Sequence, residues 1–185
     1  MQAMSIEGAV ALVTGANRGI GRALTEALLA RGAKKVYAAA RQPEALRGVG
    51  DERVVALRLD VTDADQIRAA VDAAPDVGLV FNNAGVTLAR DIAASTLLDH
   101  ARLEMEVNYF GPLQLLHGMA PTLARNGGGA VVNIGSLAGL TNIPMFPTYS
   151  ASKAALHSLT QGRAACSGRR APPCSASTPA RSTPT

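Results

Sequence analysis

The sequence predicts an α/β fold, a doubly wound parallel sheet with helices on both faces. Two observations support this prediction. Short apolar runs typical of buried strands alternate along the chain with longer runs typical of helices. In addition, a glycine-rich turn at residues 14–21 directly follows the first apolar run and leads into an alanine- and leucine-rich run. In sheets of this kind, ligands bind at the carboxyl ends of the strands, where the strand order reverses.

Each expected element has its own local signal. The first strand is the apolar run Val10–Val13, and the helix after the turn ends near Arg31-Gly32, because glycine is a frequent stop signal. Apolar runs then predict strands at 35–40, 54–59, 77–81 and 130–134. Helical patterns predict helices at 64–73 and 97–123, and a further helix that begins near Tyr149.

Length and composition point to a single domain. The chain has 185 residues, of which 48% are hydrophobic, and this is enough for a buried core. No stretch is long enough to span a membrane, and the N-terminus lacks the charged and apolar regions of a signal peptide. We therefore expect a cytoplasmic protein without a membrane partner.

The net charge of +4 does not indicate a polyanionic partner. Of the 18 basic residues, 4 lie after residue 161, where there is no Asp or Glu, so 14 basic residues face 14 acidic ones in the remainder. The globular part is formally neutral, and we expect no nucleic-acid partner. We also expect no metal site, because both cysteines lie after residue 161 and the histidines show no ligand spacing: Cys166, Cys174, His100, His117 and His157.

The glycine-rich turn has the composition and position of a phosphate-binding turn. A helix that starts directly after such a turn directs backbone N–H groups and the positive end of its dipole toward a pyrophosphate. Gly15 would permit the tight turn, Gly19 the close approach of phosphate, and Gly21 the close packing of helix on strand. A turn with a purely structural role is the alternative. The residues expected to bind a ligand here are Gly15, Asn17, Arg18, Gly19, Ile20 and Gly21.

A second set of residues has the chemistry of a proton-transfer site. Ser136, Tyr149 and Lys153 supply a hydroxyl, a phenol and an ammonium, and the last two lie one helical turn apart on one helix face. A neighbouring ammonium stabilises a phenolate, so such a phenol can give or take a proton near neutral pH. The alternative is that the pair lies on a solvated helix face and has no role.

These residues together resemble a known family, the classical short-chain dehydrogenase/reductases. The resemblance rests on motifs that occur in the same order: Thr14-Gly15-x-x-x-Gly19-Ile20-Gly21, Asn82-Asn83-Ala84-Gly85, Asn108, Ser136 and Tyr149-x-x-x-Lys153. It covers roughly residues 5–161. The resemblance implies a Rossmann-type domain at residues 1–161 that transfers a hydride between a nicotinamide cofactor and a carbonyl or secondary alcohol.

The resemblance also implies a role for each catalytic residue. Tyr149 would be the general acid in reduction and the base in oxidation, Ser136 would hold the substrate oxygen, and Lys153 would bind the nicotinamide ribose. The backbone carbonyl of Asn108 would hold a water that leads to the lysine. Pro112, four residues later, cannot donate to that carbonyl and would leave it free and the helix bent. A packing kink without function is the alternative.

Basic residues after the first two strands favour NADP over NAD. No carboxylate follows the second strand until Glu44, whereas Arg41 and Arg18 are placed to pair with a 2′-phosphate. Family members with basic residues at these two places tend to prefer NADP, and the alternative is that both arginines are only solvated. Asp60-Val61 resembles the family segment that contacts adenine, although a helix-capping role is the competing interpretation of Asp60.

The fourth expected strand leads into a segment of small and amide side chains. The resemblance places Asn82, Ala84 and Gly85 beside the adenosine side of the cofactor, where they also stabilise the sheet. An ordinary turn is the alternative. Further along, the loop 137–147 is expected to form an apolar wall that suits a ketone or aldehyde of moderate size. The resemblance also implies a homodimer or tetramer.

Residues 162–185 are expected to form a disordered tail, because they lack periodicity and large apolar side chains. Full-length family members continue with more helix, a strand ending in Pro-Gly, a substrate lid and a final strand. Cys174 to Thr185, back-translated with chosen codons and read in a shifted frame, gives Leu-Gly-Val-Tyr-Pro-Gly-Pro-Val-Asp-Thr-Asp-Met, which resembles that strand. We therefore hypothesise a truncated C-terminus produced by a single-base frameshift.

A truncation of this kind keeps two further functions open. Without the missing strand, the sheet edge and the substrate site would be exposed. The chain would then be an inactive fragment, or a non-catalytic module that binds NADP or dimerises.

Overall fold

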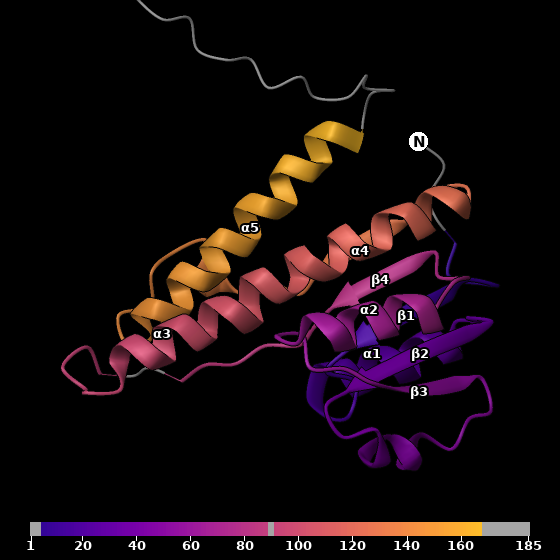
Figure 1. The fold of residues 1–185 in the computed structure, drawn as a ribbon, viewed down its shortest axis with the longest axis horizontal. Coiled ribbons are helices and arrows are strands. Elements are labelled where there is room, and N and C mark those ends of the chain that lie inside the picture. The colour runs from indigo at the N-terminus through magenta and orange to yellow at the C-terminus, as the bar shows by residue number, and fades with distance from the viewer. Residues whose placement is uncertain (1–4, 89–90, 168–185) are drawn as a thin grey trace, which may run out of the picture.

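The parallel sheet predicted from the sequence is present. The computed structural model describes residues 5–88 and 91–167. Its sheet has five parallel strands in the order β3-β2-β1-β4-β5 (Figure 1). The strands are β1 Val10–Thr14, β2 Lys35–Ala40, β3 Val54–Arg58, β4 Leu79–Asn82 and β5 Ala130–Asn133. The order reverses beside β1, so the predicted crevice lies where β1 and β4 end.

Helices cover both faces of the sheet, as predicted. One face packs against α2 and α4, which bury Leu12 and Val80 of the strands, and the other packs against α1, which buries Val13 and Val36. Every residue of β1 is buried, which explains why the strand is a continuous apolar run. The helices are α1 Gly19–Ala30, α2 Ala64–Ala73, α3 Leu97–Met105, α4 Gly111–Arg125 and α5 Pro147–Ser167. The structure also contains two short 3₁₀ helices, η1 Pro43–Val49 and η3 Leu137–Gly139.

A wide helical turn interrupts the long helix that the sequence predicts at 97–123. Residues Glu106–Phe110 form a π-helical turn, η2, between α3 and α4, and the Gly111 N–H donates to the Glu106 carbonyl five residues earlier. Pro112 has no N–H to continue the regular pattern, so a local change of hydrogen bonding is expected there. The predicted irregularity is present, and it takes the form of a π turn.

The last helix extends beyond the predicted end of the domain at residue 161. Helix α5 continues to Ser167, and Figure 1 shows it running beside α3. Arginine and alanine at positions 163–165 are strong helix formers, which accounts for the extension. The predicted tail at 168–185 lies outside the described residues.

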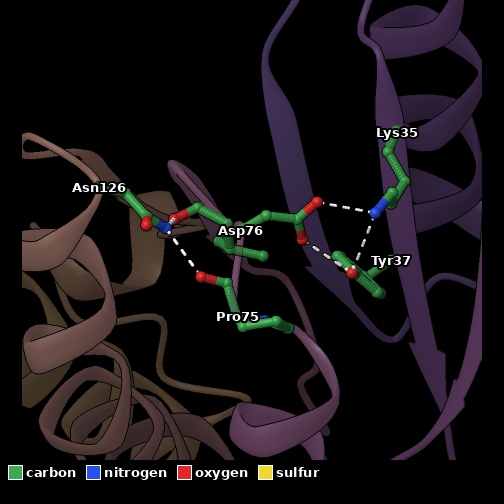
Figure 2. A network of polar contacts seen from close by, with 6 residues as sticks. Lys35, Tyr37, Pro75, Asp76 and Asn126 are labelled. Carbon is green, nitrogen blue, oxygen red and sulfur yellow. Dashed lines mark hydrogen bonds and ion pairs between the residues drawn. The ribbon is translucent and has the colours of Figure 1, made fainter.

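A polar network joins the amino ends of two strands, opposite the crevice. The Asp76 carboxylate accepts from Lys35 Nζ at 2.7 Å and from the Tyr37 hydroxyl at 2.8 Å (Figure 2). Asn126, which follows α4, donates through Nδ2 to the Pro75 carbonyl at 3.0 Å. These contacts fasten the segment before β4 to both β2 and α4.

Candidate active site

The carboxyl ends of β1 and β4 are joined by side-chain hydrogen bonds. Thr14 Oγ1 accepts from the backbone N–H groups of Asn83 and Ala84, both at 3.0 Å. In return, Asn83 Nδ2 donates to the carbonyls of Thr14 at 2.9 Å and Gly15 at 3.2 Å. These hydrogen bonds, between residues 68 to 70 positions apart in the chain, hold the glycine turn against the Asn82–Gly85 segment.

The glycine turn leaves the start of α1 open to an anion. Gly15 and Gly19 have φ angles of +64° and +55°, in the left-handed region that favours glycine. A Cβ on Gly21 would lie 2.2 Å from the Gly15 carbonyl oxygen, so no side chain fits there, whereas a Cβ on Gly19 would meet nothing within 4 Å. No side chain caps α1, and its first turn has no acidic residue. These uncapped N–H groups fit a phosphate.

The predicted nucleotide-contacting side chains lie around this turn. Arg18 immediately precedes α1, Arg41 immediately follows β2, and both are exposed. Asp60, after β3, accepts from the Thr62 N–H at 3.0 Å and from the Thr62 hydroxyl at 2.8 Å. The residue that caps α2 is Asp63, so Asp60 is not the cap of that helix.

The buried ammonium of Lys153 lies beside the end of β5. Its Nζ donates to the Ile134 carbonyl at 3.0 Å and lies 5.9 Å from the centre of the Tyr149 ring. Lys153 is only 6% exposed, and burial lowers the pKa of its ammonium below the usual 10.5. Both residues lie in the first turns of α5, as their spacing predicts. A Cβ on Gly85 would lie 3.1 Å from Asn108 Oδ1, closer than an ordinary contact, so the glycine lets the loop after β4 lie close to Asn108.

Asn108 links the loop after β4 to α5 through its side chain. Its Oδ1 accepts from the Val86 N–H at 2.9 Å, and its Nδ2 donates to the Val86 carbonyl at 2.8 Å and to Ser152 Oγ at 3.0 Å. Asn108 and Ser152 are both fully buried. The water relay through the backbone carbonyl of Asn108 stays a prediction.

Ser136 and the loop after it are packed against the same helix. Ser136 Oγ accepts from the Ala138 N–H at 3.2 Å and so caps η3. A Cβ on Gly139 would lie 2.7 Å from the Lys153 carbonyl, so η3 lies directly on α5. Within the described residues the Tyr149 hydroxyl has no hydrogen-bonding partner, and it is free to bind a ligand.

An apolar surface lies next to these residues. Leu137, Leu140 and Met145 are 68%, 66% and 65% exposed, an unusual degree for side chains of this kind. Ser150, one residue after Tyr149, anchors the loop: its hydroxyl accepts from the Ile143 N–H at 3.1 Å and donates to the Phe146 carbonyl at 2.8 Å.

Several residues of the site were not predicted from the sequence. Ser152 binds Asn108, and Asn133 accepts from Asn82 Nδ2 at 2.8 Å while donating to Thr160 Oγ1 at 2.8 Å. Glu104 and Thr148 join by a hydrogen bond of 2.5 Å. The spacing in the sequence could have indicated these residues. Glu104 lies one helical turn from Asn108, and Thr148 lies one helical turn from Ser152.

The described part of the chain contains neither a candidate metal-binding cluster nor a membrane-spanning helix. Residues 5–88 and 91–167 contain no group of three His, Cys, Asp or Glu side chains that could hold a metal ion. None of the helices in these ranges is long and apolar enough to cross a membrane.

The five-stranded parallel sheet, with its strand order reversing beside β1, is a Rossmann-type fold, and no side chain caps the helix that follows the glycine turn. The chain belongs to the short chain dehydrogenase family, whose model matches residues 9–170. Among solved structures, a short chain dehydrogenase from Burkholderia cenocepacia in complex with NADP is 44% identical, with a TM-score of 0.83 over 89% of this chain and 69% of that one. A Burkholderia phymatum relative in complex with NAD is 34% identical, with a TM-score of 0.75 over 87% of this chain and 60% of that one.

Curated relatives act on different kinds of molecule. A fatty acyl-CoA reductase of Mycobacterium tuberculosis is 34% identical over 173 residues, which are 87% of this chain and 58% of the relative. A galactitol 2-dehydrogenase of Agrobacterium fabrum is 34% identical over 169 residues, which are 87% of this chain and 65% of the relative. The chain thus spans less than two thirds of either relative.

Proposed function

We propose that the chain binds NADP(H) and catalyses hydride transfer between the nicotinamide and a carbonyl or secondary alcohol. The observation that carries the proposal is the buried Lys153 ammonium, which lies 5.9 Å from the centre of the Tyr149 ring on the helix that Asn108 joins to the loop after β4. The nicotinamide would supply or accept the hydride, and the residues of the chain would orient the substrate and move the proton.

Each side chain has a proposed task in this reaction. The Tyr149 hydroxyl gives a proton to the substrate oxygen in reduction and takes it back in oxidation, and Ser136 Oγ orients that oxygen. Lys153 holds the nicotinamide ribose through its ammonium, and its charge favours the phenolate. Asn108 fixes the spacing between the loop after β4 and α5. The backbone carbonyl of Asn108 would hold the water that connects the lysine to solvent.

NADP is the proposed cofactor because two arginines border the nucleotide crevice. Gly19 leaves open space at the start of α1, where the pyrophosphate would lie, and the exposed Arg18 and Arg41 are proposed to pair with the 2′-phosphate. Asn17, Ile20, Asp60, Val61, Asn82, Ala84 and Gly85 are proposed to contact the remainder of the cofactor. The NADP complex of the Burkholderia cenocepacia relative supports this choice, although the Burkholderia phymatum relative was solved with NAD.

The proposed substrate is a carbonyl compound with an apolar group. Fatty acyl-CoA and galactitol, which name the two curated relatives, differ strongly in polarity. The exposed Leu137, Leu140 and Met145 favour the apolar kind, and the loop 137–147 carries no charged residue to bind a polyol.

A second candidate is a nucleotide-binding module without turnover. It is supported by the uncapped start of α1 after the glycine turn, which would bind a nucleotide whether or not the residues around Tyr149 are active. Such a module would bind NADPH through the glycine turn and leave a carbonyl substrate unchanged.

One experiment separates these functions. NADPH binding is measured by thermal shift, and NADPH oxidation is followed with a panel of apolar and polyhydroxy carbonyl compounds. Tyr149→Phe is expected to lower kcat by about 100-fold or more while the Kd for NADPH stays within about twofold, because only the proton donor is lost. Tyr109→Phe, at a tyrosine that packs edge-on against Phe110, is the matched control and should retain activity. Binding without turnover in the unsubstituted chain supports the module, and full activity in Tyr149→Phe refutes the proposed mechanism.

A further inference from the structure

A fully buried carboxylate lies one helical turn before Asn108. Glu104 has no exposed surface, its Oε1 accepts from the Leu88 N–H at 2.6 Å, and its Oε2 accepts from the Thr148 hydroxyl at 2.5 Å. These partners are 16 and 44 residues away in the sequence, so the carboxylate joins α3 to the loop after β4 and to the start of α5.

Glu104 and Asn108 make parallel connections between the same segments. Asn108 binds Val86 and Ser152, and Glu104 binds Leu88 and Thr148. Because Thr148 and Ser152 are also one turn apart, the two connections stack along α5.

The two connections end next to the two reacting side chains. Ser152 directly precedes Lys153, and Thr148 directly precedes Tyr149. The Asn108 connection therefore fixes the helical turn that carries the lysine, and the Glu104 connection fixes the turn that carries the tyrosine.

Stability alone does not account for a carboxylate at this position. Moving a carboxylate out of water costs several kcal/mol, and well-packed apolar side chains often serve stability equally well. The carboxylate instead gains from its location beside the first turn of α5, because the amino end of a helix favours a negative charge. A charge-assisted hydrogen bond also has a well-defined geometry, so it can fix the orientation of the first turn of α5.

We propose that Glu104 is a positioning residue that orients the Tyr149 phenol through Thr148. This inference rests on the proposed function of Tyr149 as the proton donor. Glu104 does not contact the substrate: it holds the first turn of α5 against the loop after β4, so that the phenol points into the crevice. A displacement of about 1 Å at a reacting group can lower a rate by about 100-fold.

The test uses substitutions at Thr148, which change the connection without removing the buried carboxylate. Thr148→Val keeps the shape and removes the hydroxyl, and it is expected to lower kcat by about tenfold or more while the Kd for NADPH stays within about twofold. Thr148→Ser keeps the hydroxyl and should restore kcat to within about threefold. Thr122→Val, at a buried threonine near the end of α4, is the matched control. A loss in Thr148→Val that Thr148→Ser does not restore overturns the proposal.

A second measurement does not depend on turnover. The chain has three tyrosines, Tyr37, Tyr109 and Tyr149, so ¹³Cζ-labelled tyrosine gives three resonances, and Tyr149→Phe assigns one of them. In Thr148→Val and Glu104→Gln the Tyr149 resonance is expected to shift or broaden, whereas the other two stay unchanged. The double variant should show no larger loss of kcat than the more severe single variant, because both disrupt one connection.

The outcomes of this measurement are distinct. An unchanged Tyr149 resonance, or equal changes at all three tyrosines, overturns the positioning role. A selective change at Tyr149 in a chain without turnover supports the positioning contact and refutes the proposed function.

Discussion

Lys153 shows how one side chain serves the site at the residue scale. Its ammonium is buried, donates to the Ile134 carbonyl and lies beside the Tyr149 ring. A buried ammonium needs a hydrogen-bonding partner because it has lost its water shell. The Ile134 carbonyl at the end of β5 supplies that partner, and the sheet thereby fixes the position of the charge in the crevice.

Arg41 is the residue on which the proposed cofactor preference depends most directly. Arg41→Ala is expected to raise the Kd for NADPH about tenfold, equivalent to about 1.4 kcal/mol, and to change the Kd for NADH less than about twofold. The reason is that only NADPH has the 2′-phosphate. Fluorescence titration with both nucleotides measures the difference.

Arg68→Ala is the control for this prediction, because the Arg68 side chain is 73% exposed and pairs with Asp65 on α2. It should change neither constant. Equal weakening of NADPH and NADH binding by Arg41→Ala would contradict the assignment of Arg41 to the phosphate.

Residues that act through local spacing were predictable, and residues that act through distant contacts were not. The separation of Tyr149 and Lys153 is one helical turn, and the sequence alone contains it. Glu104 meets Leu88 and Thr148 only after α3, the loop after β4 and α5 have packed together. No local pattern encodes that meeting.

At the scale of elements, the strands and helices follow local patterns closely. The bounds predicted for β2 and α2 are those observed, Lys35–Ala40 and Ala64–Ala73. The π turn in Glu106–Phe110 differs, because Pro112 predicts that the regular pattern breaks but not how the chain reforms its hydrogen bonds. At the end of this turn Gly111 packs closely against Val61, since a Cβ on Gly111 would lie 2.8 Å from the Val61 carbonyl oxygen.

The network of Asp76 makes the joint between β2 and β4 sensitive to acid. Burial alone would raise the pKa of Asp76, but hydrogen bonds from Lys35 and Tyr37 outweigh burial and hold this pKa below the usual 3.8. A carboxyl whose pKa is lowered by folding stabilises the fold above its unfolded pKa, and this contribution is lost as the pH falls through the folded value. The stabilisation is therefore present at neutral pH and disappears below about pH 4.

We predict that Asp76→Asn lowers the free energy of unfolding by about 0.5–1 kcal/mol at pH 7, since the pair is partly exposed. The difference from the unsubstituted chain should be smaller at about pH 3, below the usual carboxyl pKa of about 3.9, than at pH 7. Urea unfolding at both pH values measures it. Asp99→Asn removes an ion pair whose side chains are 82% and 72% exposed and should change stability little. A deficit of Asp76→Asn that is constant with pH would contradict the assignment.

At the scale of the whole molecule, β5 forms one edge of the sheet in the described residues. Its outer neighbour is absent there, and Val132 is 39% exposed. Within the described residues, this edge and the apolar side chains of Leu137, Leu140 and Met145 are open to solvent. The sheet can be predicted from the sequence because its strands follow repeated local patterns. Whether β5 lies at the edge of the sheet cannot, because that depends on contacts between segments far apart in the chain.

The frameshift hypothesis leads to a prediction about turnover. A chain continued in the frame inferred from back-translation of Cys174 to Thr185 should bind NADPH with a Kd within about threefold of that of the present chain, because the glycine turn is common to both. Its kcat with an apolar carbonyl compound should be at least about tenfold higher, because a covered site excludes water and orients the substrate. Assays of both chains side by side, together with resequencing of the gene, measure this. Equal turnover would show that the added segment is not needed.

The Asn83 amide donates to the Thr14 and Gly15 carbonyls and so holds the glycine turn in place before a ligand binds. One side chain holds the nucleotide turn to the strand end that leads toward the reacting residues, before any ligand arrives. A nucleotide that enters such a preorganised crevice spends little of its association free energy on ordering the walls. The entropy cost of bringing the glycine turn and the end of β4 together is met when the chain folds, and it does not recur each time a ligand binds.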